Sequence, residues 1–216
     1  SSEKQIVLGY GAYKKEKGLL NKMIRFDAFS VALQYFSYAL AGMPYMGVGR
    51  NLAYKKSVFF DNKGFASHIH LPSGDDDLFI QEVANKQNVA IAISSNSHTI
   101  SEAKQRLKEW IFQRRRHITT SEQYKFGYKL LLGLWPFSQL LFWLTFMGLL
   151  FFESTILMVL PFFFFRIFIC YVLYYKLMKK LKTSDLLLLF PLYEFLHLFI
   201  QGIFVLLNSK NKPTSW

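Results

Sequence analysis

Long apolar stretches in the second half of the chain constrain its fold more than any other feature. Beyond Tyr128 the sequence is dominated by Leu, Phe, Ile and Tyr, whereas nearly all of the carboxylates lie before that residue. A transmembrane helix needs about 20 consecutive, mostly apolar residues. The stretches that meet this requirement run from about 130 to 152, from 154 to 175 and from 186 to 207. The sequence therefore predicts an all-α membrane domain of three transmembrane helices after a soluble part.

The charges beside these stretches predict on which side of the membrane the soluble part lies. The connection between the second and third stretches is rich in lysine, namely Lys176, Lys179, Lys180 and Lys182. The connection between the first and second stretches has Glu153 and no basic residue. Cytoplasmic connections are enriched in Lys and Arg. We therefore expect a multi-pass protein of a bacterial-type cytoplasmic membrane, with the soluble part in the cytoplasm and the C-terminal tail on the outer face.

The formal net charge of +12 suits either a membrane surface or nucleic acid, and the positions of the basic residues favour the membrane. The basic residues sit beside apolar stretches, whereas a nucleic-acid-binding domain places them on an extended polar face with interleaved aromatic residues. The single cysteine, Cys170, lies inside an apolar stretch, so this chain alone forms neither a disulfide framework nor a Cys-based zinc site. We expect membrane lipids and no nucleic acid among its partners.

A charged residue interrupts the second apolar stretch and requires a partner. Arg166, if unpaired there, costs about 2.5 to 3.5 kcal/mol on insertion scales. Glu194 in the third stretch is the expected partner, and helical spacing places His197 and Gln201 on the same face. These residues form either an ion pair that holds the helices together or a polar path for a sugar or lipid-linked product.

The soluble half has the pattern of an α/β domain. Apolar runs at 5–9 and 89–93 predict buried strands, and the glycines of 9–11 predict a turn after the first. Apolar residues at helical spacing predict a helix from Leu19 to about Leu40. Residues 99–102, Thr-Ile-Ser-Glu, have the pattern of a capping box and predict the start of another helix.

Two clusters of charge in this half have both structural and functional interpretations. Asp75, Asp76 and Asp77 precede a helical run, so they either stabilise a helix N-terminus or form a catalytic or metal-binding cluster. The nearby 68–71 segment, His-Ile-His-Leu, is either a half-exposed strand or part of a zinc site. The basic amphipathic segment 105–117 either lies against anionic head groups or holds a diphosphate with its arginines.

Taken in order along the chain, three segments resemble motifs of the family 2 membrane glycosyltransferases, such as cellulose, hyaluronan and poly-N-acetylglucosamine synthases. Residues 47–51, Gly-Val-Gly-Arg-Asn, resemble a glycine-containing part of the acceptor site. Residues 74–78, Gly-Asp-Asp-Asp-Leu, resemble a Thr-Glu-Asp-like motif whose Asp is the general base. Residues 113–117, Gln-Arg-Arg-Arg-His, resemble the Gln-x-x-Arg-Trp motif that binds the donor diphosphate on an interface helix.

The resemblance implies a role for each matching residue. Asp75 is implied as the general base, with Asp76 in its place if the register shifts by one. The implied donor-diphosphate residues are Gln113, Arg116 and His117, and the implied acceptor-site residues are Gly47, Gly49 and Asn51. His117 stands where the family has Trp, which weakens stacking at the acceptor end of the site, and Gly74 stands where it has Glu.

The resemblance also implies how the chain is divided. Residues 1–117 are expected to be the C-terminal part of a cytoplasmic GT-A catalytic domain, including its interface helix. A connector at 118–129, the transmembrane helices within 130–207 and a tail at 208–216 follow. The family's first half, with nucleotide-binding strands and the Asp-x-Asp that holds Mg²⁺ or Mn²⁺, is expected before Ser1. We therefore expect no metal ligands in this chain.

The expected function is inverting transfer of a sugar from a nucleotide-sugar to a lipid or polysaccharide acceptor at the inner face of the membrane, in envelope polysaccharide or glycolipid synthesis. One alternative is a catalytically incomplete scaffold that binds envelope-biosynthesis partners. A transporter or lipid-binding protein is a further alternative, which only the polar residues of the apolar stretches favour.

Overall fold

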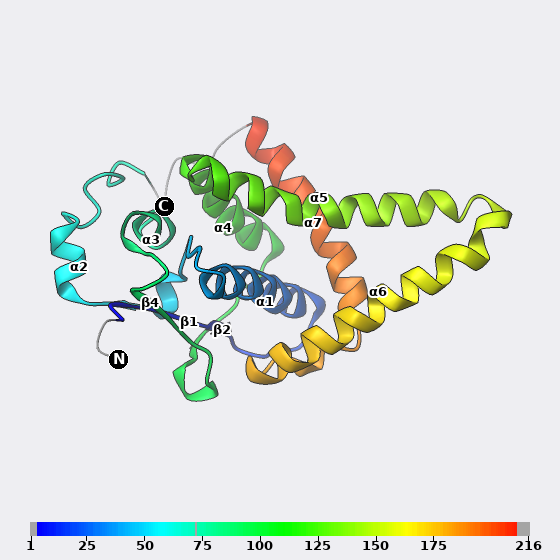
Figure 1. The fold of residues 1–216 in the computed structure, drawn as a ribbon, viewed down its shortest axis with the longest axis horizontal. Coiled ribbons are helices and arrows are strands. Elements are labelled where there is room, and N and C mark those ends of the chain that lie inside the picture. The colour runs from blue at the N-terminus through cyan, green and yellow to red at the C-terminus, as the bar shows by residue number, and fades with distance from the viewer. Residues whose placement is uncertain (1–3, 72, 211–216) are drawn as a thin grey trace.

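The computed structural model describes residues 4–71 and 73–210 and shows a small α/β part followed by three long helices (Figure 1). The helices of the α/β part are α1 (Leu19–Leu40), α2 (Lys56–Asp61), α3 (Asp77–Val83) and α4 (Leu107–Thr120). The long helices are α5 (Phe126–Leu149), α6 (Glu153–Lys180) and α7 (Phe190–Lys210). The α/β class and the long apolar helices are as expected, although the small sheets by themselves do not identify a GT-A domain.

The strands form two small sheets. β1 (Ile6–Gly9) pairs antiparallel with β3 (Leu52–Tyr54) and parallel with β4 (Val89–Ala92), and its Ile6 and Leu8 side chains are completely buried. β2 (Gly11–Tyr13) pairs in parallel with β5 (Thr99–Ser101). The expected strands at 5–9 and 89–93 are therefore confirmed.

Three local predictions about this part are wrong. Residues 9–11 do not turn, because the chain continues as an extended strand into β2. Residues 99–102 do not begin a helix, because β5 pairs with β2 and α4 starts only at Leu107. The 68–71 segment is not a strand but part of a series of turns, in which His68 is buried beside Ser67 and Glu82.

The helix α1 occupies the span that its apolar spacing predicts, and it forms the centre of the core. Its aromatic side chains Phe26, Phe29, Tyr35 and Phe36 are all buried. The helix ends where Gly42 adopts a positive φ of 83°, a conformation that glycine adopts without a steric penalty. Phe26 contacts the Tyr193 ring and Phe29 contacts the Tyr174 ring, so the core extends onto α7 and α6.

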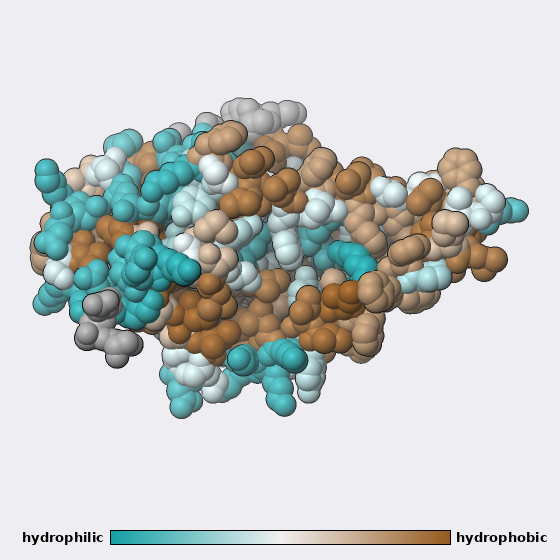
Figure 2. Space-filling view, in the orientation of Figure 1, coloured by the Kyte–Doolittle hydropathy of each residue, from teal (hydrophilic) through white to brown (hydrophobic). Residues whose placement is uncertain are grey.

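All three long helices are long and apolar enough to cross a membrane. The helices α5 and α6 form a hairpin that projects away from the α/β part, and its surface is mostly hydrophobic (Figures 1 and 2). The helix α6 extends beyond the predicted Tyr175 to Lys180, because cationic residues in the last turn favour the negative end of the helix dipole. The expected tail begins inside α7, and residues 211–216 lie outside the described part of the chain.

An ion pair joins α1 to the connection between α6 and α7. The guanidinium of Arg25 donates two hydrogen bonds of 2.7 Å to Asp185, and Lys15 lies 3.4 Å from the same carboxylate. The hydrogen bond from Arg25, together with its charge and that of Lys15, lowers the pKa of Asp185 to about 2.

We expect this pair to make stability depend on pH in the acid range. Because the pKa of Asp185 is lower in the folded protein than in the unfolded chain, its contribution is complete above about pH 4 and disappears as the pH falls toward 2. At pH 6, Asp185→Asn is expected to lower the free energy of unfolding by roughly 1 kcal/mol, after allowance for screening by solvent. Denaturation in detergent at several pH values measures the difference, which should shrink on acidification. A difference that is constant with pH would contradict the assignment.

Candidate functional site

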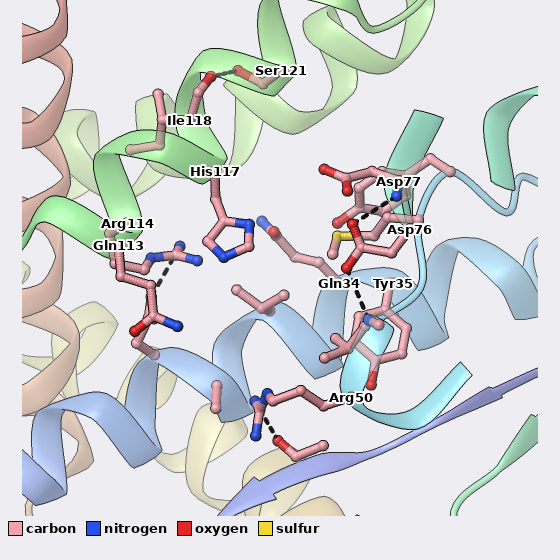
Figure 3. Close-up of a pocket in the computed structure, with 18 of the residues that line it drawn as sticks. Gln34, Tyr35, Arg50, Asp76, Asp77, Gln113, Arg114, His117, Ile118 and Ser121 are labelled. Carbon is pink, nitrogen blue, oxygen red and sulfur yellow. Dashed lines mark hydrogen bonds and ion pairs between the residues drawn. The ribbon is translucent and has the colours of Figure 1, made fainter. Parts of the chain in front are cut away.

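A cavity of about 480 Å³ lies where α1, α4 and the loops at 45–50 and 75–77 meet (Figure 3). Its polar lining includes residues from both of the charged motifs singled out in the sequence. These residues are Asp75, Asp76 and Asp77 of the acidic cluster and Gln113, Arg114, Arg116 and His117 of the basic segment. Gly49 and Arg50 of the 47–51 segment also line the cavity. Leu132 of α5 also lines the cavity, so the cavity reaches the first of the long helices.

The acidic loop, residues 75–77, begins a helix as one of its two interpretations predicts, while its catalytic or metal-binding role stays a prediction. Asp76 is the N-cap of α3, and its carboxylate accepts hydrogen bonds from the backbone N–H groups of Asp77, at 2.9 Å, and Gly49, at 2.8 Å. The Tyr124 hydroxyl donates to Asp77, which is buried. Asp75 is exposed and lies on the cavity lining. The loop therefore begins a helix and also presents carboxylates to the cavity.

The neighbouring carboxyls of Asp76 and Asp77 have pKa values that shift in opposite directions. Burial by itself raises the pKa of Asp76, but its hydrogen bonds with Asp77 and Gly49 outweigh this and hold the pKa below the ordinary value. Burial, followed by the hydrogen bond and the charge of Asp76, raises the pKa of Asp77 well above its ordinary value. The pair therefore favours one negative charge, which is carried by Asp76.

Gly74 allows this loop to approach the end of α4. Its φ is +118°, and a Cβ there would lie 2.7 Å from Leu78 Cδ1 and 3.1 Å from Thr120 Cγ2. Any larger side chain at this position would meet the same obstruction.

Gly74→Ala is therefore expected to lower the free energy of unfolding by about 1 to 3 kcal/mol, through backbone strain and the clash with Leu78. Thermal unfolding in detergent measures the effect. Gly127→Ala is a matched control, because a Cβ at Gly127 meets no atom within 4 Å. Equal stability of the two variants would contradict the prediction.

The helix α4 brings its polar side chains to the other side of the cavity. His117 points from α4 into the space that Asp76 and Asp77 border (Figure 3). Burial, reinforced by the charge of Arg114, lowers the pKa of His117 to about 4, so its ring is neutral at pH 7. The basic segment is helical as expected, and it contributes Gln113, Arg116 and His117 to one cavity with the acidic loop.

The structure places the three proposed acceptor-site residues differently from one another. Gly49 lines the cavity and donates to Asp76. Gly47 instead packs tightly beside Leu52. A Cβ at Gly47 would lie only 2.9 Å from Leu52 Cδ1. The Asn51 amide donates to the carbonyls of Tyr10, at 2.9 Å, and Ser97, at 2.7 Å, so it ties the turn before β3 to the β1–β2 junction and to the loop before β5, outside the cavity lining.

Asp27 belongs to this site and is missing from the residues predicted from sequence. It is buried on α1, where its Oδ1 lies 3.1 Å from Arg114 Nη2 and 2.8 Å from His197 Nε2 of α7. Burial alone raises the pKa of Asp27, but the charge of Arg114 and the hydrogen bond with His197 reverse this and lower it. The signal available in the sequence was a carboxylate within the apolar stretch 23–33 of a predicted helix.

Arg50 holds the backbone beside the cavity, whereas the histidines near the acidic loop lie elsewhere. Arg50 donates to the carbonyls of Gly11 and Ala12 and lies over the Tyr13 ring. In the described parts of the chain, no group of three or more His, Cys, Asp or Glu side chains is arranged to hold a metal ion. His68 and His70 instead border a separate cavity of about 230 Å³.

No protein family, curated protein or solved structure matches this chain. The chemistry of the cavity and its position beside the long helices therefore have to carry the functional interpretation.

Proposed function

We propose that this chain is the C-terminal part of an inverting family 2 glycosyltransferase with a GT-A catalytic domain. It transfers a sugar from a nucleotide-sugar to a lipid or polysaccharide acceptor at the inner face of a bacterial-type membrane. One observation carries the proposal. The acidic loop and the Gln-x-x-Arg segment, which are distant in sequence, line one cavity beside the long helices. A carboxylate facing arginines across a cavity provides a base for a hydroxyl and a binding site for a phosphate leaving group.

Asp75 is the carboxylate of the acidic loop that an acceptor hydroxyl reaches most easily. It is exposed at the cavity, whereas both oxygens of Asp76 already accept backbone hydrogen bonds. In the proposed step, the acceptor hydroxyl forms a bond with the anomeric carbon, and its proton passes to Asp75. The bond between that carbon and the diphosphate breaks on the opposite face.

The residues of α4 stabilise the leaving group. The guanidinium of Arg116 and the amide of Gln113 offer hydrogen bonds to the negative charge that develops on the diphosphate. Neutral His117 donates a hydrogen bond at neutral pH without placing another positive charge beside Arg114 and Arg116. A Mg²⁺ or Mn²⁺ ion, which family members use, would neutralise phosphate charge, and the described residues of this chain form no group to hold it.

Transfer of radiolabelled sugar tests the proposal, with membranes from cells that carry the complete gene and a panel of nucleotide-sugars. We expect transfer by the wild type and loss of transfer in Arg116→Ala. Arg106→Ala is the matched control and should retain activity, because Arg106 is exposed at the N-terminus of α4 and does not line the cavity. Absence of transfer by the wild type with every donor would favour the scaffold alternative.

A further inference from the structure

One face of α7 packs against the α/β part along nearly its whole length. Near its start Tyr193 contacts the ring of Phe26, and near its end Phe204 contacts the ring of Trp110. Arg115 of α4 donates to the Asn208 side chain at 2.8 Å, and the Asn208 amide donates to the Arg115 carbonyl at 3.0 Å. Both ends of this helix are therefore held against the same α/β part.

The helix α7 also runs in a different direction from the hairpin. It crosses the α5–α6 hairpin at an angle, whereas α5 and α6 extend away from the α/β part (Figure 1). Its Glu194 contacts Gln139 of α5 and Arg166 of α6. These residues lie roughly 15 to 20 Å from the tip of the hairpin at 1.5 Å per residue, so α7 meets the hairpin partway along it.

The opposite face of α7 is apolar and exposed. The buried side chains are Phe190, Tyr193, Glu194, His197, Phe204 and Asn208. The exposed ones are Leu192, Phe199, Ile203, Val205, Leu206 and Leu207. The buried residues recur at intervals of 3, 1, 3, 7 and 4, and the exposed residues Leu192, Phe199, Ile203 and Leu206 recur at intervals of 7, 4 and 3, so these two groups occupy opposite faces of the helix. Val205 and Leu207 are also exposed, near the end of the helix.

We propose that α7 does not cross the membrane but lies in the plane of its cytoplasmic leaflet, with this exposed face in the lipid. An in-plane helix sinks about 5 to 10 Å into the boundary between head groups and acyl chains. The α5–α6 hairpin then provides the only two crossings among the described helices. This topology agrees with the positive-inside rule. It puts on the cytoplasmic side both the lysines that end α6 and the lysines that follow the apolar part of α7 in the sequence, Lys210 and Lys212.

The proposal concerns topology and does not depend on the reaction. Single cysteines in a Cys170→Ser background of the complete protein test it, with a membrane-impermeant thiol reagent applied to intact cells and to inverted vesicles. Ser184→Cys reports the exposed α6–α7 connection, Ser154→Cys reports the exposed hairpin tip, and Ser215→Cys reports the chain beyond α7.

We expect the Ser184→Cys and Ser215→Cys variants to be labelled only in inverted vesicles and the Ser154→Cys variant to be labelled only in intact cells. Labelling of the Ser215→Cys variant in intact cells, with the Ser184→Cys variant protected there, would show three crossings and overturn the proposal. Fusions after Trp216 give a second measurement. A fluorescent fusion protein that matures only in the cytoplasm should be bright, and alkaline phosphatase, which is active only outside it, should be inactive. The reverse pattern would also overturn the proposal.

Discussion

Asp75→Asn is expected to reduce the rate of sugar transfer by about 10²- to 10⁴-fold, the usual contribution of a positioned general base. The amide cannot accept the acceptor proton, but it has nearly the same size. Since Asp75 is exposed, the substitution should leave folding and donor affinity unchanged. Initial rates at saturating donor, together with donor binding by calorimetry, separate the chemical step from binding.

Asp76→Asn is the matched comparison for this prediction. Its remaining carbonyl oxygen can still accept a hydrogen bond from Gly49, so we expect a smaller loss of rate. If Asp76→Asn abolishes transfer while Asp75→Asn retains it, the base is Asp76. Full activity in both variants would contradict the proposed mechanism.

Glu194→Ala is expected to destabilise the protein by about 2 to 4 kcal/mol, because it leaves Arg166, a partly buried charge inside an apolar helix, without its partner. Arg166 Nη2 lies 3.0 and 2.9 Å from the two Glu194 oxygens, and Gln139 donates to one of them at 3.1 Å. Glu194 is only 3% exposed, and the Arg166 side chain lies among apolar residues of α6, so the pair is mostly shielded from water. Unfolding in mixed micelles with a denaturing detergent measures the loss.

Two further variants show whether the effect arises from the ion pair. The double variant Arg166→Met/Glu194→Met removes both charges and should recover most of the stability, because well-packed apolar residues often replace a buried pair without loss. Glu153→Ala removes an exposed carboxylate at the hairpin tip and should change stability by less than about 0.5 kcal/mol. An equal loss in Glu153→Ala and Glu194→Ala would contradict the role of burial.

The elements that were predictable from sequence depend on local patterns. The helix at Leu19–Leu40 and the long apolar helices follow from residue spacing and apolar length, which need no knowledge of distant contacts. The Arg166–Glu194 pair was also predictable, because a charge among apolar residues has few possible partners. The pair confirms the predicted ion pair between the second and third apolar stretches. A polar path for a sugar or lipid-linked product stays a prediction.

The parts that sequence reasoning missed depend on contacts between distant segments. The pairing of β2 with β5 joins residues far apart in the chain. Residues 99–101 therefore form a strand, although their local pattern is that of a capping box. Asp27 acquires its importance from Arg114 and His197, which belong to two other helices. Asn51 was assigned to a ligand by its motif, but its amide is held by two backbone carbonyls.

The packing of α7 on the α/β part has a practical consequence for biochemistry. A chain cut after residue 125 would remove the partner rings of Phe26, Phe29 and Trp110, which are buried against α6 and α7. It would also leave Asp27 with Arg114 but without His197. A water-soluble version of the α/β part would thus expose part of its own core and alter the charge balance beside the cavity. Purification of this protein therefore calls for detergent or lipid nanodiscs from the first step.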